Sequence, residues 1–346
     1  MKILVTGASG FIGSFVVEGA LERGHQVWAG MRHTSSKQNL MELITPAHKN
    51  SSSSLELITL TYNAPEILTE QLKSFCQQNG EFDAVIHVAG VTNCPRTQDF
   101  NKGNTEVTEN LIVALRNSGM AGAKFIYMSS LGTFGPIREQ KPFMPIVESD
   151  NQSPLSDYGK SKLTSERIIM NTPGLDYIII RPTAVYGPRD KDLFKLVKSV
   201  RFRLDAIAGL KEQAVTFVYV RDLAQAVLLA AESKIITQKA YFVSDGRVYS
   251  SSDFSNEAAY ALGHHWTIHL KIPLFIVYMV SFISGTFAKI FGRGTTLNKD
   301  KYLILKQRNW QCDIQPIMND LGYRPKYTLK EGVHETVNWY KTHHWL

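Results

Sequence analysis

The chain has 346 residues, of which 44% are apolar and 20% are charged, so it can bury a sizeable core as one large domain or two closely joined ones. Its 38 basic and 31 acidic residues leave a formal charge of +7, which would attract phosphorylated ligands, nucleic acid or an anionic membrane surface. Because the basic residues are scattered and form no dense block, we expect no nucleic-acid partner.

The cysteine content and the N-terminus bear on the cellular compartment. Cys76, Cys94 and Cys312 are an odd number at wide spacing, which is not typical of a metal site or a disulfide framework. We therefore expect no metal and a reducing, intracellular setting. The chain reaches Gly7 too early to hold the apolar core of a signal peptide, so we expect a cytoplasmic protein.

Strands and helices are predicted to alternate along the first half of the chain. Residues 2–6 form an apolar run that favours a strand buried on both faces, and a helix should follow from residue 10 to about residue 23. Further strands are predicted, with helix-like stretches between them, at 26–31, 55–60, 84–89, 124–129 and 177–181. Residues 45–54 are predicted to form a polar loop. This alternation indicates an α/β fold with a doubly wound parallel sheet of the Rossmann type.

The alternation weakens after residue 188. A strand at 215–220 and a helix at 222–232 should return to the sheet, and the chain is helix-rich from about residue 246. We therefore expect a dinucleotide-binding domain of residues 1–185, with its sheet completed by 215–245. Residues 186–214 and 246–346 should form a smaller, helix-rich C-terminal substrate-binding lobe. Ligands in such sheets bind in the crevice beyond the carboxyl ends of the strands.

An unusually apolar segment lies at 272–291. Its first 17 residues, 272–288, carry no charge, but they are fewer than the ~20 that a spanning helix needs. We consider three interpretations, namely a buried helix of the lobe, a roof over an apolar substrate pocket, or a helix lying on a membrane surface. Basic residues around the segment would assist membrane contact, and they are Lys271, Lys289, Arg293 and Lys299.

A glycine-rich turn follows the first predicted strand. The spacing of Gly7, Gly10 and Gly13 is a GxxGxxG pattern that opens a helix, so the backbone N–H groups and the helix dipole can face a pyrophosphate. We expect the residues of this turn to bind a dinucleotide cofactor, and they are Gly7, Ser9, Gly10, Phe11, Ile12 and Gly13.

The end of the second strand bears on the choice of nucleotide. A cofactor that lacks a 2′-phosphate is usually held there by an acidic residue, but this chain has Met31 and Arg32. A guanidinium matches the geometry of a phosphate, so we predict NADP(H) as the cofactor, while NAD stays possible. The alternative is that Arg32 is a solvated surface charge and that the protein does not discriminate between the two cofactors.

Three residues are predicted to form a catalytic centre. Tyr158 and Lys162 are four residues apart, hence on the same face of a helix. A phenol with a pKa near ~10 is a poor base at neutral pH, but an adjacent cation and an oxidised nicotinamide favour the phenolate. Lys162 would also hold the cofactor ribose. Ser130, after the fifth strand, would donate a hydrogen bond to the substrate oxygen.

Several segments together resemble the extended short-chain dehydrogenase/reductases, also called the epimerase/dehydratase group, over nearly the whole chain. The segments are 6–13, 85–90, 127–135, 158–162, 181–188 and 217–224. The resemblance implies that Ser130 rather than Ser129 is the catalytic serine and that Asn104, near the nicotinamide, is a fourth catalytic residue. It further implies that the adenosine side of the cofactor is contacted by Val88, Ala89 and Gly90. The nicotinamide end would be contacted by Pro182 and Val185. Dimerisation is common among members of this family, so we expect a homodimer.

Departures from the family pattern reduce the number of substrate classes that the chain could act on. Leu131 and Gly132 stand where the dehydratases of this family have an acidic pair, which disfavours dehydration. Ala184 and Val215 stand where nucleotide-sugar epimerases commonly have an asparagine and an arginine. The apolar segment near the C-terminus resembles those of 3β-hydroxysteroid dehydrogenases and dihydroflavonol reductases in the same family. This implies an NADP(H)-dependent oxidoreductase that interconverts a secondary alcohol and a ketone on a hydrophobic, steroid-like or flavonoid-like molecule. The alternative is a nucleotide-sugar epimerase.

Overall fold

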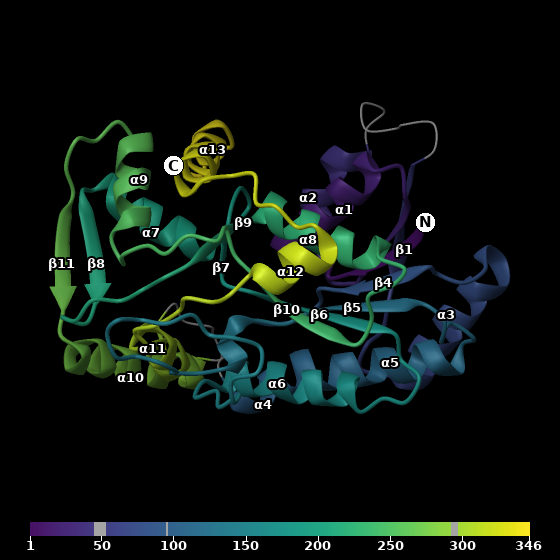
Figure 1. Ribbon diagram of the computed structural model, residues 1–346. Coiled ribbons are helices and arrows are strands. Elements are labelled where there is room, and N and C mark those ends of the chain that lie inside the picture. Colours follow the sequence, from purple (N-terminus) through teal and green to yellow (C-terminus); the bar gives the residue numbers. More distant parts are fainter. Residues whose placement is uncertain (45–52, 95, 292–296) are drawn as a thin grey trace.

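The computed structural model describes residues 1–44, 53–94, 96–291 and 297–346. Residues 45–52 of the predicted polar loop therefore lie outside the described residues. Figure 1 shows a central sheet with helices on both faces and a smaller, helix-rich part to one side of it. This arrangement confirms the predicted fold class.

The central sheet has seven parallel strands in the order β10-β6-β5-β4-β1-β2-β3. The strands are β1 (Lys2–Thr6), β2 (Gln26–Met31), β3 (Ser54–Thr59), β4 (Ala84–His87), β5 (Lys124–Met128), β6 (Tyr177–Pro182) and β10 (Lys239–Val243). The order reverses between β1 and β4, and a crevice opens beyond the carboxyl ends of strands at such a point. The first six strands lie within two residues of their predicted bounds.

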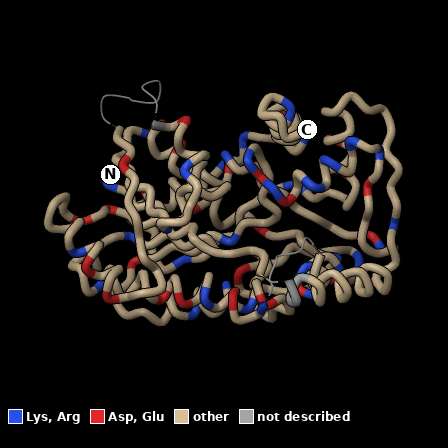
Figure 2. Tube along the Cα trace, turned by 180° about the vertical axis from the view of Figure 1, so that it is seen from behind, with Lys and Arg blue, Asp and Glu red and all other residues tan. Residues whose placement is uncertain are grey.

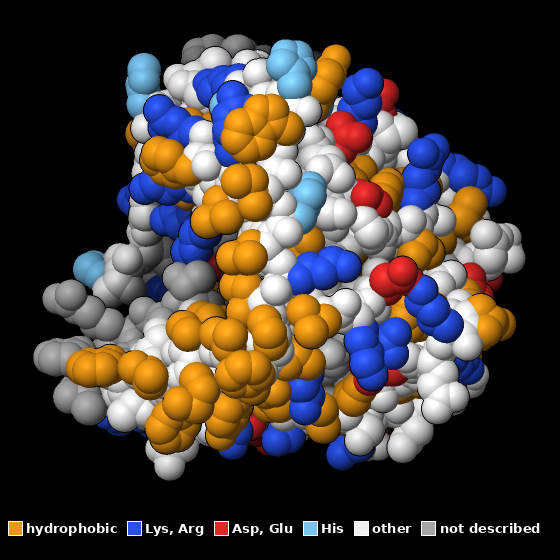
Figure 3. All heavy atoms as spheres, turned by 90° about the vertical axis from the view of Figure 1, so that its left-hand side faces the viewer, with side chains coloured by type: hydrophobic (Ala, Val, Ile, Leu, Met, Phe, Trp, Pro, Cys, Tyr) orange, Lys and Arg blue, Asp and Glu red, His pale blue; other side chains and the backbone are white. Residues whose placement is uncertain are grey.

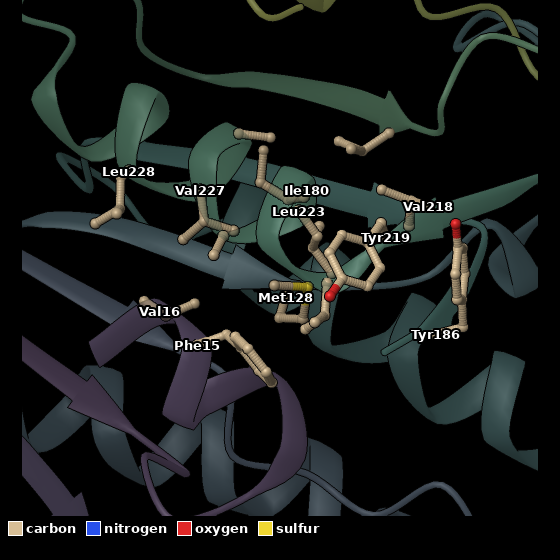
Figure 4. Packing of buried hydrophobic residues seen from close by; sticks show 14 of the residues in the cluster. Phe15, Val16, Met128, Ile180, Tyr186, Val218, Tyr219, Leu223, Val227 and Leu228 are labelled. Carbon is tan, nitrogen blue, oxygen red and sulfur yellow. The ribbon is translucent and has the colours of Figure 1, made fainter. Parts of the chain in front are cut away.

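Helices cover both faces of the sheet (Figure 1). α1 packs against α8 on one face, and α3, α5 and α6 lie on the other. Their bounds are α1 (Phe11–Glu22), α3 (Pro65–Asn79), α5 (Val107–Asn117), α6 (Asp157–Met170) and α8 (Val220–Glu232). Figure 4 shows apolar side chains of α1, α8, β5 and β6 meeting in one buried cluster, among them Val16, Val227, Met128 and Ile180. Burial of these side chains fixes the helices against the strand ends that form the site.

The strand expected at 215–220 is shorter and has a different partner. β9 (Phe217–Tyr219) pairs with β7 (Ala184–Tyr186) in a separate two-stranded sheet. The prediction that this strand returns to the central sheet is therefore wrong. The reason is that β10 pairs with β6 along that edge, with Lys239 opposite Ile178, so β9 has no neighbouring strand there.

The remaining part is built mainly from the last third of the chain. β8 and β11 pair in parallel as a second two-stranded sheet. The elements are α7 (Asp192–Arg201), β8 (Leu204–Ala208), α9 (Asp253–Ala261), β11 (Ile268–Ile272), α10 (Leu274–Phe291), α11 (Lys299–Leu305), α12 (Gln315–Leu321) and α13 (Leu329–Thr342). The start of α13 is specified locally, because Thr328 and Glu331 form a capping box.

α10 corresponds to the apolar segment predicted at 272–291. It is not a buried helix, because Phe275 and Phe282 are 70% and 58% exposed, so the first of the three interpretations is wrong. Within the described part of the chain, no helix combines the length and the apolar character that crossing a membrane requires.

Candidate active site

A cleft of about 2130 Å³ lies at the carboxyl ends of the central strands and extends to α10 and α11. Of the predicted catalytic residues, Ser130, Tyr158 and Lys162 line it, whereas Asn104 does not. The residues predicted to bind the cofactor also line it, and they are Tyr158, Lys162, Gly7, Ser9, Gly10, Phe11, Ile12, Gly13, Arg32, Val88, Ala89, Gly90, Pro182 and Val185. The fold thus brings together residues that are far apart in the sequence.

The glycine turn between β1 and α1 is shaped for close approach. Gly7 has a φ of +66°, and a Cβ atom there would lie 2.7 Å from the backbone nitrogen of Ala89. A Cβ atom on Gly13 would lie 2.1 Å from the carbonyl oxygen of Gly7. Among the described residues, no side chain caps the first turn of α1 and that turn holds no acidic residue. Its N–H groups are therefore oriented to receive an anion such as a pyrophosphate, so the turn fits a dinucleotide.

Arg32 follows β2 at the edge of the cleft. Its side chain is exposed and, among the described residues, it makes no hydrogen bond or ion pair. The neighbouring short helix α2 (Gln38–Met41) is tied to the glycine turn, because Asn39 Nδ2 donates to the carbonyl oxygen of Ser9 at 3.0 Å. Arg32 and the glycine turn line the same cleft, and no described carboxylate pairs with the guanidinium.

Ser130 and Tyr158 lie side by side in the cleft. Ser130 follows β5, and its Oγ accepts a hydrogen bond from the backbone N–H of Gly132 at 3.0 Å. Burial raises the pKa of Tyr158 to about 12, while hydrogen bonding to Ser130 opposes this rise. α6 begins one residue before Tyr158, and Ser156 caps it by accepting from the N–H of Gly159. The local sequence therefore fixes the position of the tyrosine.

Lys162 lies one helical turn after Tyr158. Its Nζ donates to the carbonyl oxygen of Met128 at 2.8 Å and lies 4.8 Å from the centre of the Tyr127 ring. Burial lowers the pKa of Lys162 to about 8, although the carboxylate of Glu166 raises it. We expected Lys162 to lower the pKa of Tyr158. In the structure burial is the largest effect on Tyr158, so the phenol is protonated at neutral pH.

Asn104 lies behind the cleft rather than in its lining. It is 1% exposed and belongs to a π-helical turn at Asn101–Glu106, a type of distortion that often marks functional sites. Its Oδ1 accepts from the N–H of Val91 at 2.7 Å, and its Nδ2 donates to Ser161 Oγ at 2.9 Å. Asn104 thereby joins the loop after β4 to the catalytic helix, so its geometry is that of a positioning residue.

Gly90 lies on the catalytic side of the cleft, although we expected it at the adenosine side. A Cβ atom at Gly90 would lie 2.8 Å from Asn104 Oδ1 and 3.3 Å from Lys162 Nζ. The absence of a side chain therefore lets the loop after β4 approach both residues.

Glu166 and Arg181 form a buried ion pair that the sequence did not point to. Arg181 donates to both carboxylate oxygens of Glu166, at 3.0 and 2.7 Å, and both side chains are at most 3% exposed. Ser129 also donates to Glu166, so its hydroxyl is already engaged whereas that of Ser130 faces Tyr158. The only sequence signal for Glu166 is its position one turn after Lys162.

Asp300, at the start of α11, is a second residue that sequence reasoning missed. Its carboxylate accepts from the backbone N–H of Asp157 and, at 3.4 Å, from that of Tyr158. An acidic group at this end also interacts favourably with the dipole of α6. The contact links the substrate end of the cleft directly to the catalytic tyrosine.

The substrate end of the cleft has an aliphatic wall formed mainly by α10 and α11, beside charged residues such as Lys195 and Lys301. Its apolar lining residues are Ile207, Ile272, Ile276, Val277, Val280, Ile304 and Leu305. Ala184 and Val215 also line the cleft, so the two polar groups that they replace in nucleotide-sugar epimerases are missing from its wall. Arg189 also lines the cleft, and its guanidinium pairs with Glu18 at 3.5 Å and stacks on Phe15.

Comparison with known proteins agrees with this geometry. The family model described as NAD dependent epimerase/dehydratase family matches residues 3–243. The chain is 26% identical to a UDP-glucose 4-epimerase from Vibrio cholerae, with 97% of this chain and 94% of that protein covered. It is 27% identical to a sterol-4-alpha-carboxylate 3-dehydrogenase (decarboxylating) from Dictyostelium discoideum, with 96% and 99% covered.

A solved structure shows the same fold. It is a UDP-glucuronic acid 4-epimerase from Bacillus cereus in complex with NAD, with a TM-score of 0.75, 21% identity and 99% of both chains covered. Together with the family match, the glycine turn and the Tyr158 helix, these similarities establish the class of protein. The chain belongs to the NAD-dependent epimerase/dehydratase family of extended short-chain dehydrogenase/reductases, and it is an NAD(P)-dependent enzyme.

Proposed function

We propose that the enzyme interconverts a secondary alcohol and a ketone on a hydrophobic, steroid-like or flavonoid-like substrate. The observation that carries this proposal is the position of Tyr158 and Ser130. They face a cleft whose far end is lined by aliphatic side chains of α10 and α11. An apolar wall favours an apolar ligand through burial of its surface.

The same proposal assigns the proton chemistry to residues of the chain. A nicotinamide cofactor held by the glycine turn and Lys162 would supply or accept the hydride at the substrate carbon. In the reducing direction, Tyr158 Oη donates a proton to the substrate oxygen, and Ser130 Oγ donates a hydrogen bond to that oxygen as its negative charge develops. Lys162 holds the cofactor ribose and supplies a positive charge near the phenol. Asn104 positions α6 through Ser161 and does not touch the substrate.

NADP(H) is the preferred cofactor in this proposal. Arg32 lies at the end of β2, it is exposed, and no described carboxylate pairs with it. A guanidinium in this position can form two parallel hydrogen bonds with a 2′-phosphate. We further propose that residues 1–185 and 215–245 hold the cofactor, while 186–214 and 246–346 hold the substrate.

The test combines a substrate panel with cofactor binding. Purified enzyme is assayed with NADPH or NADH against steroid-like and flavonoid-like ketones, and with small polar ketones as matched controls. We expect turnover with the apolar ketones and tighter binding of NADPH than of NADH. Absence of hydride transfer to every apolar ketone would refute the substrate class, and tighter binding of NADH would refute the cofactor assignment.

A nucleotide-sugar epimerase is the second candidate function. The similarity to the Vibrio cholerae enzyme favours it, and Lys195 and Lys301 bring positive charge to the cleft. However, Asp190 and Asp205 line the same end, which lowers its attraction for a diphosphate. The second candidate predicts that the purified protein retains bound dinucleotide and interconverts a UDP- or GDP-hexose with its epimer, which NMR would detect.

A further inference from the structure

One face of the molecule carries an extended set of exposed apolar side chains. We call it the lobe face, and it comprises Phe202, Leu204, Trp266, Ile268, Leu270, Phe275, Met279, Phe282 and Ile283. Phe202 is 75% exposed and Phe275 is 70% exposed. Figure 3 shows hydrophobic side chains running down this face to a broad apolar area at its lower end, where α10 lies. Contiguous patches of this kind mark interaction sites.

The outer side of α10 is a regular apolar stripe. Phe275, Met279, Phe282 and Ile283 stand at positions i, i+4, i+7 and i+8, so they share one side of the helix. Each is at least half exposed. Figure 2 shows that α10 is nearly free of charged residues along its described length, whereas the helices beneath the sheet carry both signs of charge. Exposure of this side of α10 to water is therefore energetically unfavourable.

The chain segment that carries most of the lobe face is basic. The sequence contains no aspartate or glutamate from residue 258 to residue 299, while Lys271 and Lys299 are exposed. Arg201 and Arg203 add positive charge at the turn before β8, and the Arg203 guanidinium stacks on Trp266 at 4.4 Å. The acidic residue of β8, Asp205, is 2% exposed and bound to His269 at 2.8 Å. A basic border around an apolar area complements an anionic surface.

We propose that the lobe face docks on an anionic membrane surface. An exposed apolar surface with basic residues around it can lie at the level of the lipid headgroups, which fits a helix that is not long and apolar enough to span the membrane. A second copy of the chain is a poorer occupant. A twofold dimer would place the same basic border against itself, and like charges repel.

α10 lies between the lobe face and the cleft, so membrane docking would bring the lipid close to the substrate end of the cleft. Its inner side chains Ile276, Val277 and Val280 line the cleft, and its outer side chains face away from the molecule. A single helix thus separates the lobe face from the substrate end of the cleft. If the proposed function holds, an apolar substrate dissolved in the bilayer enters the cleft beside α10 without crossing bulk water.

Vesicle binding tests the docking without any substrate. Purified enzyme is floated with vesicles of phosphatidylcholine alone, or of phosphatidylcholine containing phosphatidylserine. We expect binding to the anionic vesicles that weakens with salt, and a loss of about tenfold or more in the F275S/F282S variant, because two large apolar contacts are removed. The matched control is I67S, which removes an apolar side chain that is 53% exposed on α3.

Further measurements separate the outcomes. K271E keeps the apolar stripe and reverses a border charge, so it should weaken binding to anionic vesicles only. The variants lie outside the cleft lining, so unchanged cofactor affinity shows that they are folded. Equal binding to neutral vesicles, no vesicle binding at all, or equal losses in I67S and F275S/F282S would overturn the proposal. A dimer that dissociates in F275S/F282S, without vesicle binding, would assign the lobe face to a second copy instead.

Discussion

The two ends of the cleft are built on different principles. At the cofactor end, backbone segments pack directly against each other. For example, a Cβ atom on Gly13 would lie 2.1 Å from the carbonyl oxygen of Gly7. At the substrate end, α11 has no buried residue and α10 presents apolar side chains to both the cleft and the outside. Hydride transfer demands close positional control, whereas ligand selection depends on side chains that can change without disturbing the backbone.

The largest expected effect is on turnover, and it comes from Tyr158, which lies between the cofactor end and the substrate end of the cleft. Tyr158→Phe removes the proton donor but keeps the ring, so turnover should fall by about 10²- to 10⁴-fold. Cofactor affinity should stay within about twofold, since the phenol is not the main cofactor contact in our proposal. Steady-state kinetics and a binding titration measure the two quantities. Retained turnover would mean that the proton comes from another group.

Loss of an ion pair should reduce the free energy of unfolding more at the cofactor end, where the pair is fully buried, than at the substrate end. Glu166→Gln leaves the buried Arg181 without its counter-ion and should reduce the free energy of unfolding by about 3–5 kcal/mol. The matched change at the substrate end is His269→Gln, which alters the pair with Asp205. His269 is 31% exposed, so water can replace its contact and the loss should be much smaller. Denaturant unfolding of both variants checks this, and equal losses would contradict the distinction.

Glycine replacement offers a similar test. Gly13→Ala forces a Cβ atom against backbone and should cost about 1–3 kcal/mol of stability and weaken dinucleotide binding. Gly285→Ala in α10 meets no atom closer than 3.7 Å, and alanine favours a helix by about 0.5–1 kcal/mol, so this variant should be as stable or slightly more stable. Thermal unfolding and cofactor titration measure both effects. A destabilised Gly285→Ala would show that α10 is packed more tightly than the structure indicates.

Cofactor choice should depend on one exposed side chain. Arg32→Ala should weaken NADPH binding by about tenfold, because a charge-assisted hydrogen bond contributes about 1.5–3 kcal/mol and part of it is lost to solvent. NADH affinity should be unchanged, since NADH lacks the 2′-phosphate. Dissociation constants from fluorescence titration give the comparison. Equal losses for both cofactors would mean that Arg32 supports the fold of the turn instead.

The smallest effect concerns pH. Burial lowers the pKa of Lys162 to about 8, so its ammonium loses its proton as the pH rises through that value. If the positive charge assists proton donation by Tyr158, kcat/KM for reduction should be halved at a pH of about 8 and fall further above it. The depressed pKa also means that folding is favoured by the neutral amine at high pH, and this contribution is lost as the pH falls below the unfolded value toward 8. A flat pH profile would separate Lys162 from the proton transfer.

The structure confirms several predictions that came from local sequence patterns. The first six strands, the glycine turn and the helix that carries Tyr158 and Lys162 are set by near-neighbour features such as apolar runs, positive φ at glycine and four-residue spacing. The cap that Ser156 provides at the start of α6 was not predicted, but it is also a local feature. Because these features act over a few residues, they can be predicted from the sequence itself.

Other features depend on which segments meet in space. Asn104 is buried behind the cleft because Val91 and Ser161 engage its amide, and β9 leaves the central sheet because β10 occupies the edge beside β6. The capping of α6 by Asp300 joins groups more than a hundred residues apart. Local patterns along the chain were enough to predict the first six strands, the glycine turn and the tyrosine-lysine spacing. Which side of α10 lines the cleft and which side is exposed to solvent depends on the complete fold, because burial depends on contacts between distant segments.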